Sequence, residues 1–371
     1  MAAPKRPRIS IIVNGTLRMA NGIRVSNLFD PLADRFELVH AYRTGGRIGS
    51  LMGFAAAIER DDPDLVYAVD IGYSTSAAML HRIVRGRRYI LHTGDPSYIL
   101  LRNMGRPWVE LQIARAMEKA MPALAEHIVC SGHGLAGWYR ERGYTEVSYI
   151  PDGVDLERFQ PRDASDLRRR LGVADVLTIG LVGSLNWNEK YQTCYGDEIV
   201  EAMPHLRDVP VKGIIIGGGS GLAHLKEKAA RLGVTDRIVF VGAVPHSEAP
   251  EYICALDICV STQTPDEVGK MRSTSKMGEY LACNRYVISS DVSEETHEML
   301  SRVGVLLPYA GLADKEYPHR IAEQVRNVVA QPDLLSRAGQ AREEARTRFD
   351  RQELSRKLGD VLDAALAGPP R

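Results

Sequence analysis

A glycine turn between a predicted strand and a predicted helix is suited to binding phosphate. The segment 214–225 is an apolar run, followed by Gly217, Gly218 and Gly219 and then by a helical pattern. Backbone N–H groups of such a turn point at a ligand from a helix N-terminus, where the helix dipole favours an anion. The third glycine of a G-x-G-x-x-G dinucleotide fingerprint is absent, which disfavours a nicotinamide or flavin enzyme. The alternative interpretation is a tight turn that binds no ligand.

A second loop follows the predicted strand 178–182 and begins with Gly183 and Ser184. Open α/β sheets bind ligands at the carboxyl ends of their strands, and this loop lies at such an end. Lys190, in the same loop, could hold a diphosphate as a point charge. A solvated loop lysine is the alternative interpretation.

A third segment, 267–283, joins a polar loop that begins with Glu267 to a helix. It places Arg272 and Lys276 near the positive end of the helix dipole, where phosphate oxygens bind favourably. Glu279, one turn into the helix, could accept hydrogen bonds from sugar or ribose hydroxyls. The alternative is an ordinary amphipathic helix with exposed Lys and Glu side chains.

These segments belong to an alternation of strands and helices that runs through the whole chain. Short apolar runs bounded by turn residues predict buried parallel strands, and the helical patterns between them predict βαβ units. The first half is predicted to have strands at 9–13, 65–69, 89–91, 127–130 and 148–150. The second half is predicted to have strands at 177–182, 211–216, 238–241, 258–260, 286–289 and 305–307. We therefore predict an α/β protein with two doubly wound, Rossmann-like domains that face each other across a cleft.

A polar stretch rich in Pro and Gly after residue 150 marks the domain boundary. We predict a first domain over residues 1–158 and a second over residues 159–350. The last helical pattern, 351–367, is amphipathic, and we expect it to pack back onto the first domain.

Composition narrows the function classes. The chain has 371 residues, and 47 Lys and Arg balance 47 Asp and Glu, so a nucleic-acid partner is not expected. The five cysteines show neither a CxxC pair nor a Cys/His metal spacing. No apolar stretch is long enough to cross a membrane, and the run at 9–13 is too short for a signal peptide. We therefore expect a cytoplasmic protein.

The zero net charge conceals a difference between the two parts of the chain. Residues 1–150 contain 19 Lys and Arg against 14 Asp and Glu, and the remainder contains 28 against 33. A positive first half, with a basic run at 81–88, could favour peripheral contact with the inner face of an anionic membrane and a lipid-linked acceptor. Unbiased scatter of surface charge, with an ordinary basic helix end at 81–88, would explain the same pattern.

Four stretches together resemble the GT-B glycosyltransferases of retaining family 4, the glycosyl transferases group 1. One is Ile-Pro-Asp-Gly-Val-Asp-Leu-Glu-Arg-Phe at 150–159, which resembles the junction between the family's two domains. The others are the glycine stretch at 214–219 with the segment 236–245, the segment 252–261, and the segment 276–291. The resemblance covers essentially the whole chain.

The resemblance implies an enzyme that transfers a sugar with retention of anomeric configuration. The donor would be a nucleoside-diphosphate sugar, with a UDP-sugar favoured and GDP-mannose second. The acceptor would be a glycan, a lipid-linked molecule or a small molecule. The first domain would hold the acceptor and the second the donor. Because positive side chains and a helix N-terminus would neutralise the diphosphate, neither a metal nor a cofactor is expected.

The resemblance also suggests roles for individual residues. His92, Lys190 and Arg272 are assigned to catalysis, and Asp95 and Arg24 to the acceptor side. The donor-binding set is Gly15, Gly22, Gly183, Ser184, Gly217, Gly218, Gly219, Glu267, Lys276 and Glu279. The chain departs from the family's pattern at two positions, since Ser184 stands where Arg is common and Met271 where Glu is frequent.

Two other functions fit the same sequence. One is a nucleotide-sugar epimerase of the same fold, which would need further acid and base carboxylates beside the sugar. The other is a non-catalytic protein that binds a nucleotide sugar or a carbohydrate, in which Ser184 and Met271 would reflect lost activity. An epimerase converts the donor without an acceptor, a transferase needs the acceptor, and a binding protein does neither.

Overall fold

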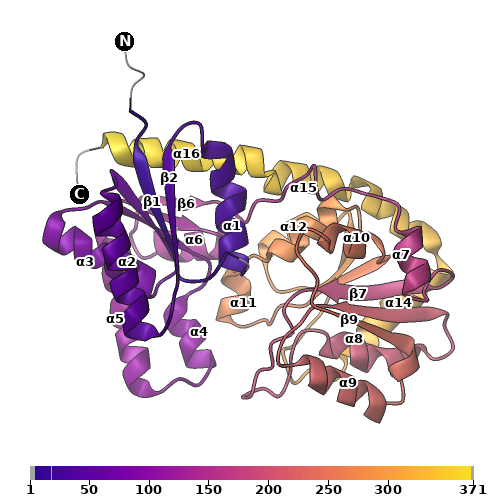
Figure 1. The fold of residues 1–371 in the computed structure, drawn as a ribbon. Helices are drawn as coiled ribbons and strands as arrows, with labels where there is room; N and C mark the ends of the chain where they lie inside the picture. The colour runs from indigo at the N-terminus through magenta and orange to yellow at the C-terminus, as the bar shows by residue number, and fades with distance from the viewer. Residues whose placement is uncertain (1–4, 18, 369–371) are drawn as a thin grey trace. The chain divides into compact units, whose positions relative to one another are not determined.

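The computed structural model describes residues 5–17 and 19–368 and divides the chain into two compact units. Unit 1 comprises Met1–Gly153, Met271–Ser273 and Phe349–Arg371. Unit 2 comprises Val154–Lys270 and Thr274–Arg348. Each unit contains a parallel sheet of six strands with helices packed on it, which confirms the predicted α/β class (Figure 1).

The sheet of unit 1 has the strand order β2-β1-β3-β4-β5-β6. Its strands are β1 (Arg8–Val13), β2 (Glu37–Tyr42), β3 (Leu65–Val69), β4 (Tyr89–Thr93), β5 (His127–Cys130) and β6 (Val147–Tyr149). The sequence pattern did not predict β2. This strand lies at the sheet edge, and each of its six residues is only half-buried, so it lacks the apolar run of an inner strand.

The helices of unit 1 cover both faces of its sheet. They are α1 (Ala20–Phe29), α2 (Arg47–Asp61), α3 (Tyr73–Arg85), α4 (Ser97–Asn103), α5 (Trp108–Leu124), α6 (His133–Arg140) and α16 (Arg351–Ala367). Successive side chains of a strand point to opposite faces. Accordingly, Ile11 packs in the cluster that holds the apolar residues of α1 and α16, while Ile12 packs with those of α2 and α3.

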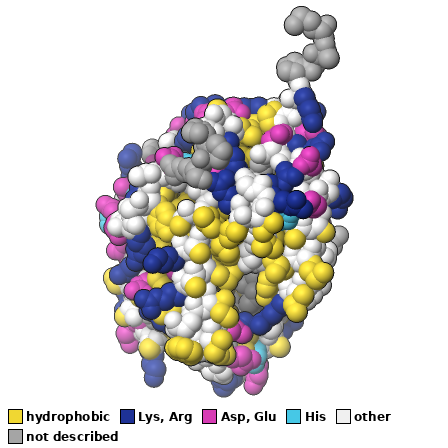
Figure 2. Space-filling view, turned by 90° about the vertical axis from the view of Figure 1, so that its left-hand side faces the viewer, with side chains coloured by type: hydrophobic (Ala, Val, Ile, Leu, Met, Phe, Trp, Pro, Cys, Tyr) yellow, Lys and Arg dark blue, Asp and Glu magenta, His cyan; other side chains and the backbone are white. Residues whose placement is uncertain are grey.

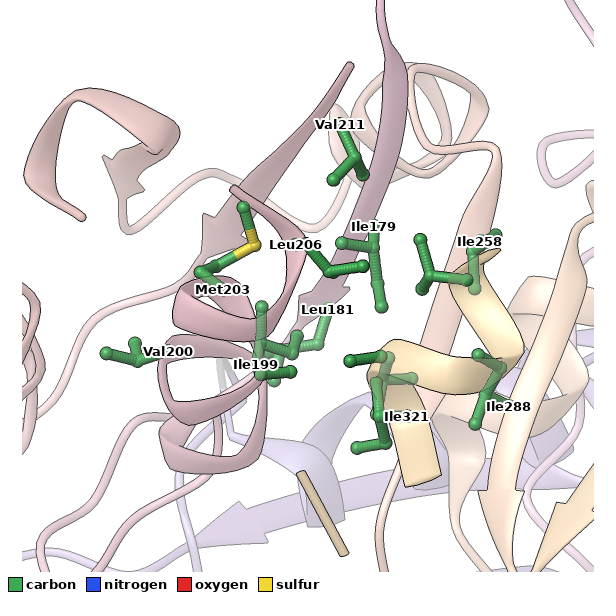
Figure 3. Packing of buried hydrophobic residues seen from close by; sticks show 14 of the residues in the cluster. Ile179, Leu181, Ile199, Val200, Met203, Leu206, Val211, Ile258, Ile288 and Ile321 are labelled. Carbon is green, nitrogen blue, oxygen red and sulfur yellow. The ribbon is translucent and has the colours of Figure 1, made fainter. Parts of the chain in front are cut away.

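The sheet of unit 2 has the order β12-β11-β10-β7-β8-β9. Its strands are β7 (Leu177–Val182), β8 (Val211–Ile216), β9 (Ile238–Gly242), β10 (Ile258–Ser261), β11 (Tyr286–Ser290) and β12 (Gly304–Leu307). Its helices are α7 (Ser165–Arg170), α8 (Asp197–Ala202), α9 (Leu222–Arg231), α10 (Ala249–Cys254), α11 (Glu267–Met271), α12 (Ser275–Ala282), α13 (Glu294–Leu300), α14 (Tyr317–Ala330) and α15 (Ala341–Phe349). Figure 3 shows the packing of this core, in which Ile199 of α8 and Leu206 lie beside Leu181 and Ile179 of β7.

The C-terminal helix α16 is part of the core of unit 1. Asp350 caps its N-terminus by accepting a hydrogen bond from the Gln352 amide. Its apolar stripe, which includes Leu358 and Leu362, is buried in the cluster that contains Leu28 of α1. Ser355 adds a buried hydrogen bond of 2.8 Å to the Leu28 carbonyl.

We expect Leu362→Ala to lower the free energy of unfolding of unit 1 by about 2–5 kcal/mol, because it leaves a cavity in a fully buried cluster. The matched change Lys357→Ala, on the solvent side of the same helix, is expected to change it by less than about 0.5 kcal/mol. Urea unfolding monitored by circular dichroism checks both values. Equal effects of the two substitutions would show that α16 does not contribute to the core.

Candidate functional site

In unit 2, two glycine-containing loops meet at the carboxyl edge of the sheet. Val182 and Ile216 are register partners at the ends of β7 and β8, so Gly183 and Gly217 follow side by side. Gly217 has φ of 151°, and a Cβ atom there would lie 1.8 Å from the Gly183 carbonyl oxygen. Gly219 has the same φ, and its Cβ would lie 2.4 Å from the Leu185 carbonyl oxygen. Only glycine permits this backbone conformation at such a close approach.

Hydrogen bonds hold the glycine turn in place. The Gly217 amide donates to the Gly242 carbonyl at 2.8 Å, and the Leu185 amide donates to the Gly218 carbonyl at 2.9 Å. Within residues 5–17 and 19–368, the amides of Gly218 and Gly219 donate no backbone hydrogen bond. The turn leads directly into α9, whose N-terminus has no side-chain cap. These amides can therefore donate to an anion.

Lys276 is the cation that the structure places against Gly183. A Cβ atom on Gly183 would lie 2.4 Å from the Lys276 Cε atom and 2.6 Å from its Nζ atom. The ammonium also lies 4.0 Å from the ring centroid of Tyr195. One turn along α12, the Tyr280 hydroxyl accepts a hydrogen bond of 2.9 Å from the Val182 amide, which anchors the helix to the end of β7. The ammonium is thereby held next to the glycine turn.

Glu279 is oriented by a short chain of hydrogen bonds. Arg158 donates from Nη2 to Nδ1 of His246 at 2.7 Å. Since arginine can only donate, His246 Nδ1 accepts, and Nε2 carries the proton of the neutral ring. His246 Nε2 then donates to Glu279 Oε1 at 2.8 Å. This bond to Oε1 orients the Glu279 carboxylate, and the Glu279 side chain is largely buried. The bond does not involve Oε2, the second oxygen of the carboxylate.

The other donor-side predictions lie in exposed loops of unit 2. Lys190 is exposed in the turn after β7, and its ammonium lies over the Tyr191 ring, 4.9 Å from the centroid. Ser184 is exposed directly after Gly183. Glu267 is the exposed first residue of α11. The structure gathers Gly183, the turn 217–219 and Lys276 at one place.

In unit 1, Arg24 of α1 lies at the centre of a charged cluster. Its Nε donates to Asp152 Oδ1 at 2.5 Å, and its Nη1 lies 3.9 Å from Asp70 Oδ1. Burial alone would lower the pKa of Arg24, but the charges of Asp152 and Asp70 more than offset this and raise it. Arg24 is therefore a permanent, well-buried positive charge at the carboxyl ends of β3 and β6.

Asp70 directly follows β3 and carries an unusual backbone conformation, with φ of 67°. Asn21 donates a hydrogen bond to its carboxylate. Burial raises the pKa of Asp70 to about 6, and the neighbouring Asp95 and Asp152 act in the same direction, while Arg24 opposes them. The carboxyl can therefore change protonation state near neutral pH.

Arg272 belongs to this cluster in unit 1. Its Nε donates to Asp95 Oδ1 at 2.7 Å. The preceding residue, Met271, packs against the apolar cluster of β5 and α6. Its carbonyl oxygen comes so close to Gly132 that a Cβ atom there would lie 2.0 Å away. Arg272 is thus assigned to unit 1, whereas Lys276 belongs to unit 2.

His92 lies in the interior of unit 1 and has no exposed surface. Its Nδ1 is 2.8 Å from the Tyr67 hydroxyl, and its Nε2 is 3.0 Å from Ser131 Oγ. Burial and the charge of Arg24 lower its pKa well below the usual value, so the ring is neutral. Both ring nitrogens of His92 therefore lie within hydrogen-bonding distance of buried side chains.

The two glycines predicted to approach the donor lie around the start of α1. A Cβ atom on Gly22 would lie 2.5 Å from the carbonyl oxygens of Thr16 and Leu17. The absence of a side chain at Gly22 thus lets the helix pack on the preceding loop. Gly15 is buried, and the nearest atom to a Cβ there would be that of Asn21, at 3.5 Å.

Several residues of these clusters were not predicted from the sequence. His246 and Arg158 gave no motif, and their relation to Glu279 depends on contacts between distant segments. Asp70 carried a usable signal, since it directly follows a buried strand at the edge where ligands bind. Within the described ranges, no group of three or more His, Cys, Asp or Glu side chains is arranged to hold a metal ion.

Comparison with known proteins identifies the family of unit 2. Residues 176–331 match the family model described as glycosyl transferases group 1. Residues 176–331 belong to the glycosyl transferases group 1 family. This group 1 domain contains the glycine turn, Lys276 and Glu279, and the match confirms the resemblance predicted from the sequence.

The whole chain has the GT-B fold. The protein HepE of Anabaena, solved in complex with UDP-glucose, matches with a TM-score of 0.77 and 16% identity over 97% of this chain and 100% of that chain. Sucrose-phosphate synthase of Thermosynechococcus elongatus matches with a TM-score of 0.79 and 18% identity, over 98% of this chain and 100% of that chain.

The matches to relatives in sequence cover shorter parts of this chain than the structural matches do. D-inositol 3-phosphate glycosyltransferase 2 of Catenulispora acidiphila is 29% identical over 202 residues, which is 49% of this chain and 45% of that protein. The first relatives in this comparison are matched over 32%, 45% and 29% of their own lengths, so the chain covers less than half of each. In the part of the chain that the structure describes, no helix is both long and apolar enough to span a bilayer.

The raised pKa of Asp70 predicts how pH affects the stability of unit 1. Between about pH 4 and pH 6 the unfolded chain releases this proton while the folded protein keeps it, so the contribution of Asp70 to stability falls as pH rises. Asp70→Asn removes this titration. We expect the stability of the variant relative to the native protein to increase across that window.

Urea unfolding at several pH values measures this difference. Asp34→Asn, which removes a carboxylate at an exposed position of the same unit, serves as the control. A constant difference between Asp70→Asn and the native protein from pH 4 to 6 would contradict the assignment.

Proposed function

We propose that this protein is a retaining glycosyltransferase that moves a sugar from a nucleoside-diphosphate sugar to an acceptor. The observation that carries the proposal is the placement of the Lys276 ammonium against Gly183, beside the turn 217–219. A UDP-sugar is the favoured donor, which is supported by the complex of HepE with UDP-glucose, and GDP-mannose is second. The acceptor is a glycan, a lipid-linked molecule or a small molecule.

The chemistry requires stabilisation of a leaving diphosphate. The bond between the sugar C1 atom and the phosphate oxygen breaks, and negative charge develops on the diphosphate. The acceptor oxygen bonds to C1 and gives up its proton to the departing diphosphate oxygen. Lys276 and the amides of Gly218 and Gly219 would bind the diphosphate oxygens where this charge develops. Lys190 would contribute a further cation from its exposed loop. These groups supply the neutralisation without a metal or cofactor.

Glu279 would bind the ribose of the donor. Its carboxylate is held by His246, which is held in turn by Arg158. A carboxylate oriented in this way can accept hydrogen bonds from vicinal hydroxyls at a low entropic cost. We therefore regard His246 and Arg158 as positioning residues for Glu279.

Unit 1 would supply the acceptor side. Arg24, Asp70 and Asp95 offer both donors and acceptors of hydrogen bonds to hydroxyl groups. Arg272 is bound to Asp95 in the same unit and adds a second positive charge to this group. His92 would act through Ser131 as a positioning residue, since it has no exposed surface.

Substitution of the lysines tests the proposed donor site. We expect Lys276→Ala and Lys190→Ala each to lower kcat/KM at least about tenfold. Each substitution removes a positive charge that would stabilise the leaving diphosphate. Glu279→Ala should have a similar effect by loss of ribose binding. Lys226→Ala, which removes an exposed lysine from α9 in the same unit, is the matched control and should leave turnover unchanged.

The assay uses UDP- and GDP-sugars with and without acceptors, after thermal shift against UDP, GDP, ADP and dTDP selects the base. Conversion of the donor sugar without an acceptor would instead identify an epimerase. Nucleotide binding with no turnover would identify a binding protein. Native turnover in all three variants would contradict the assigned site.

A further inference from the structure

Large apolar side chains are exposed together on the helices of unit 1. They include Ile48 at 76% and Met52 at 67% on α2, and Trp108 at 72% and Val109 at 60% on α5. Met104, just after α4, and Ile113 of α5 are also exposed. Figure 2 shows a broad apolar area on one face of the molecule. Monomeric proteins rarely expose such contiguous apolar area unless it binds a partner.

One ion pair brings these residues together. Arg47 Nη2 lies 3.4 Å from Glu110 Oε1, so the first turn of α2 is beside the first turn of α5. Ile48 follows Arg47 in the chain, and Trp108 and Val109 precede Glu110. We call Ile48, Met52, Met104, Trp108, Val109 and Ile113 the apolar patch.

The apolar patch is separate from the core of unit 1. The buried face of α2 is made by other side chains, which include Phe54 and Ile58, and that of α5 includes Ala114 and Met121. Both helices therefore pack on the sheet without using the patch. Its residues are each at least half exposed, so much of their apolar surface is left uncovered within the described part of the unit.

The charged residues that flank the apolar patch in the sequence are mostly positive. Exposed arginines stand on the same segments, namely Arg43, Arg47, Arg102, Arg106 and Arg115. Glu110 is the one acidic residue in the sequence ranges 38–58 and 96–117, which contain the whole patch. An apolar surface with a cationic rim is complementary to anionic lipid headgroups above an acyl layer.

We propose that the apolar patch docks unit 1 onto the surface of an anionic lipid bilayer. Trp108 and Ile48 would enter the boundary between headgroups and acyl chains, where an indole ring is favourably placed. The surrounding arginines would bind lipid phosphates. A second copy of this chain is the weaker candidate, because pairing two such patches would bring two sets of arginines together. The proposal goes beyond the transferase function and depends on neither donor nor acceptor.

Sedimentation with lipid vesicles in the absence of nucleotide tests the proposal. We expect the full chain to bind vesicles that contain about one-third phosphatidylglycerol at least about fivefold better than pure phosphatidylcholine vesicles, with a loss of binding at high salt. The variant Ile48→Ser/Trp108→Ser should lose most of this binding. The control Leu312→Ser/Val329→Ser, at exposed apolar positions of unit 2, should bind like the native protein.

Three results would overturn the proposal: no binding to anionic vesicles, equal binding by the patch variant, or a dimer in sedimentation velocity that the patch variant dissociates. Thermal melting of both variants checks that they are folded. Turnover with water-soluble substrates should be unchanged in the patch variant, so a failure of the transferase function and a failure of membrane docking give different results. A blue shift of tryptophan fluorescence on anionic vesicles alone that is lost in the patch variant would support insertion of Trp108.

Discussion

The close approach of two backbones at the carboxyl edge of the unit 2 sheet is the constraint on which the proposed donor site depends. Gly217 lies so near the Gly183 carbonyl that no side chain fits between the loops after β7 and β8. Because Gly183 also lacks a side chain, Lys276 can occupy the adjacent space, and Tyr280 anchors its helix to β7. A larger residue at either glycine would displace the amides or the ammonium, which are the groups proposed to bind the diphosphate.

The site residues of unit 1 form a cluster of partly buried charges. Two arginines and three aspartates lie at the carboxyl ends of its strands, and Arg24 is buried among them. Paired buried charges are tolerated when hydrogen bonds satisfy them, but loss of one partner is costly. Burial is the main cause of the raised pKa of Asp70, and the nearby charges of Asp95 and Asp152 add to it. Such a cluster suits an acceptor that presents hydroxyl groups better than one that presents a further anion.

Local sequence signals predicted the fold more completely than the site. All six strands of unit 2 were found, because each is an apolar run between turn residues. The edge strand β2 was missed since its residues are half-buried and mixed in character. The glycine turn and Lys276 could be predicted because each lies within a strand–turn–helix segment. The relation of His246 to Glu279, and of Arg24 to Asp152, 128 positions apart, arises only when distant segments pack together.

Hydrogen exchange of the backbone amides, measured by mass spectrometry with and without saturating UDP or GDP, tests the central claim most directly. The account predicts slower exchange in peptides that cover the turn 217–221 and the first turn of α12, because the nucleotide diphosphate would occupy their amides and Lys276. Exchange in these two segments that is unchanged by every nucleotide would contradict the placement of the donor at this edge of the sheet.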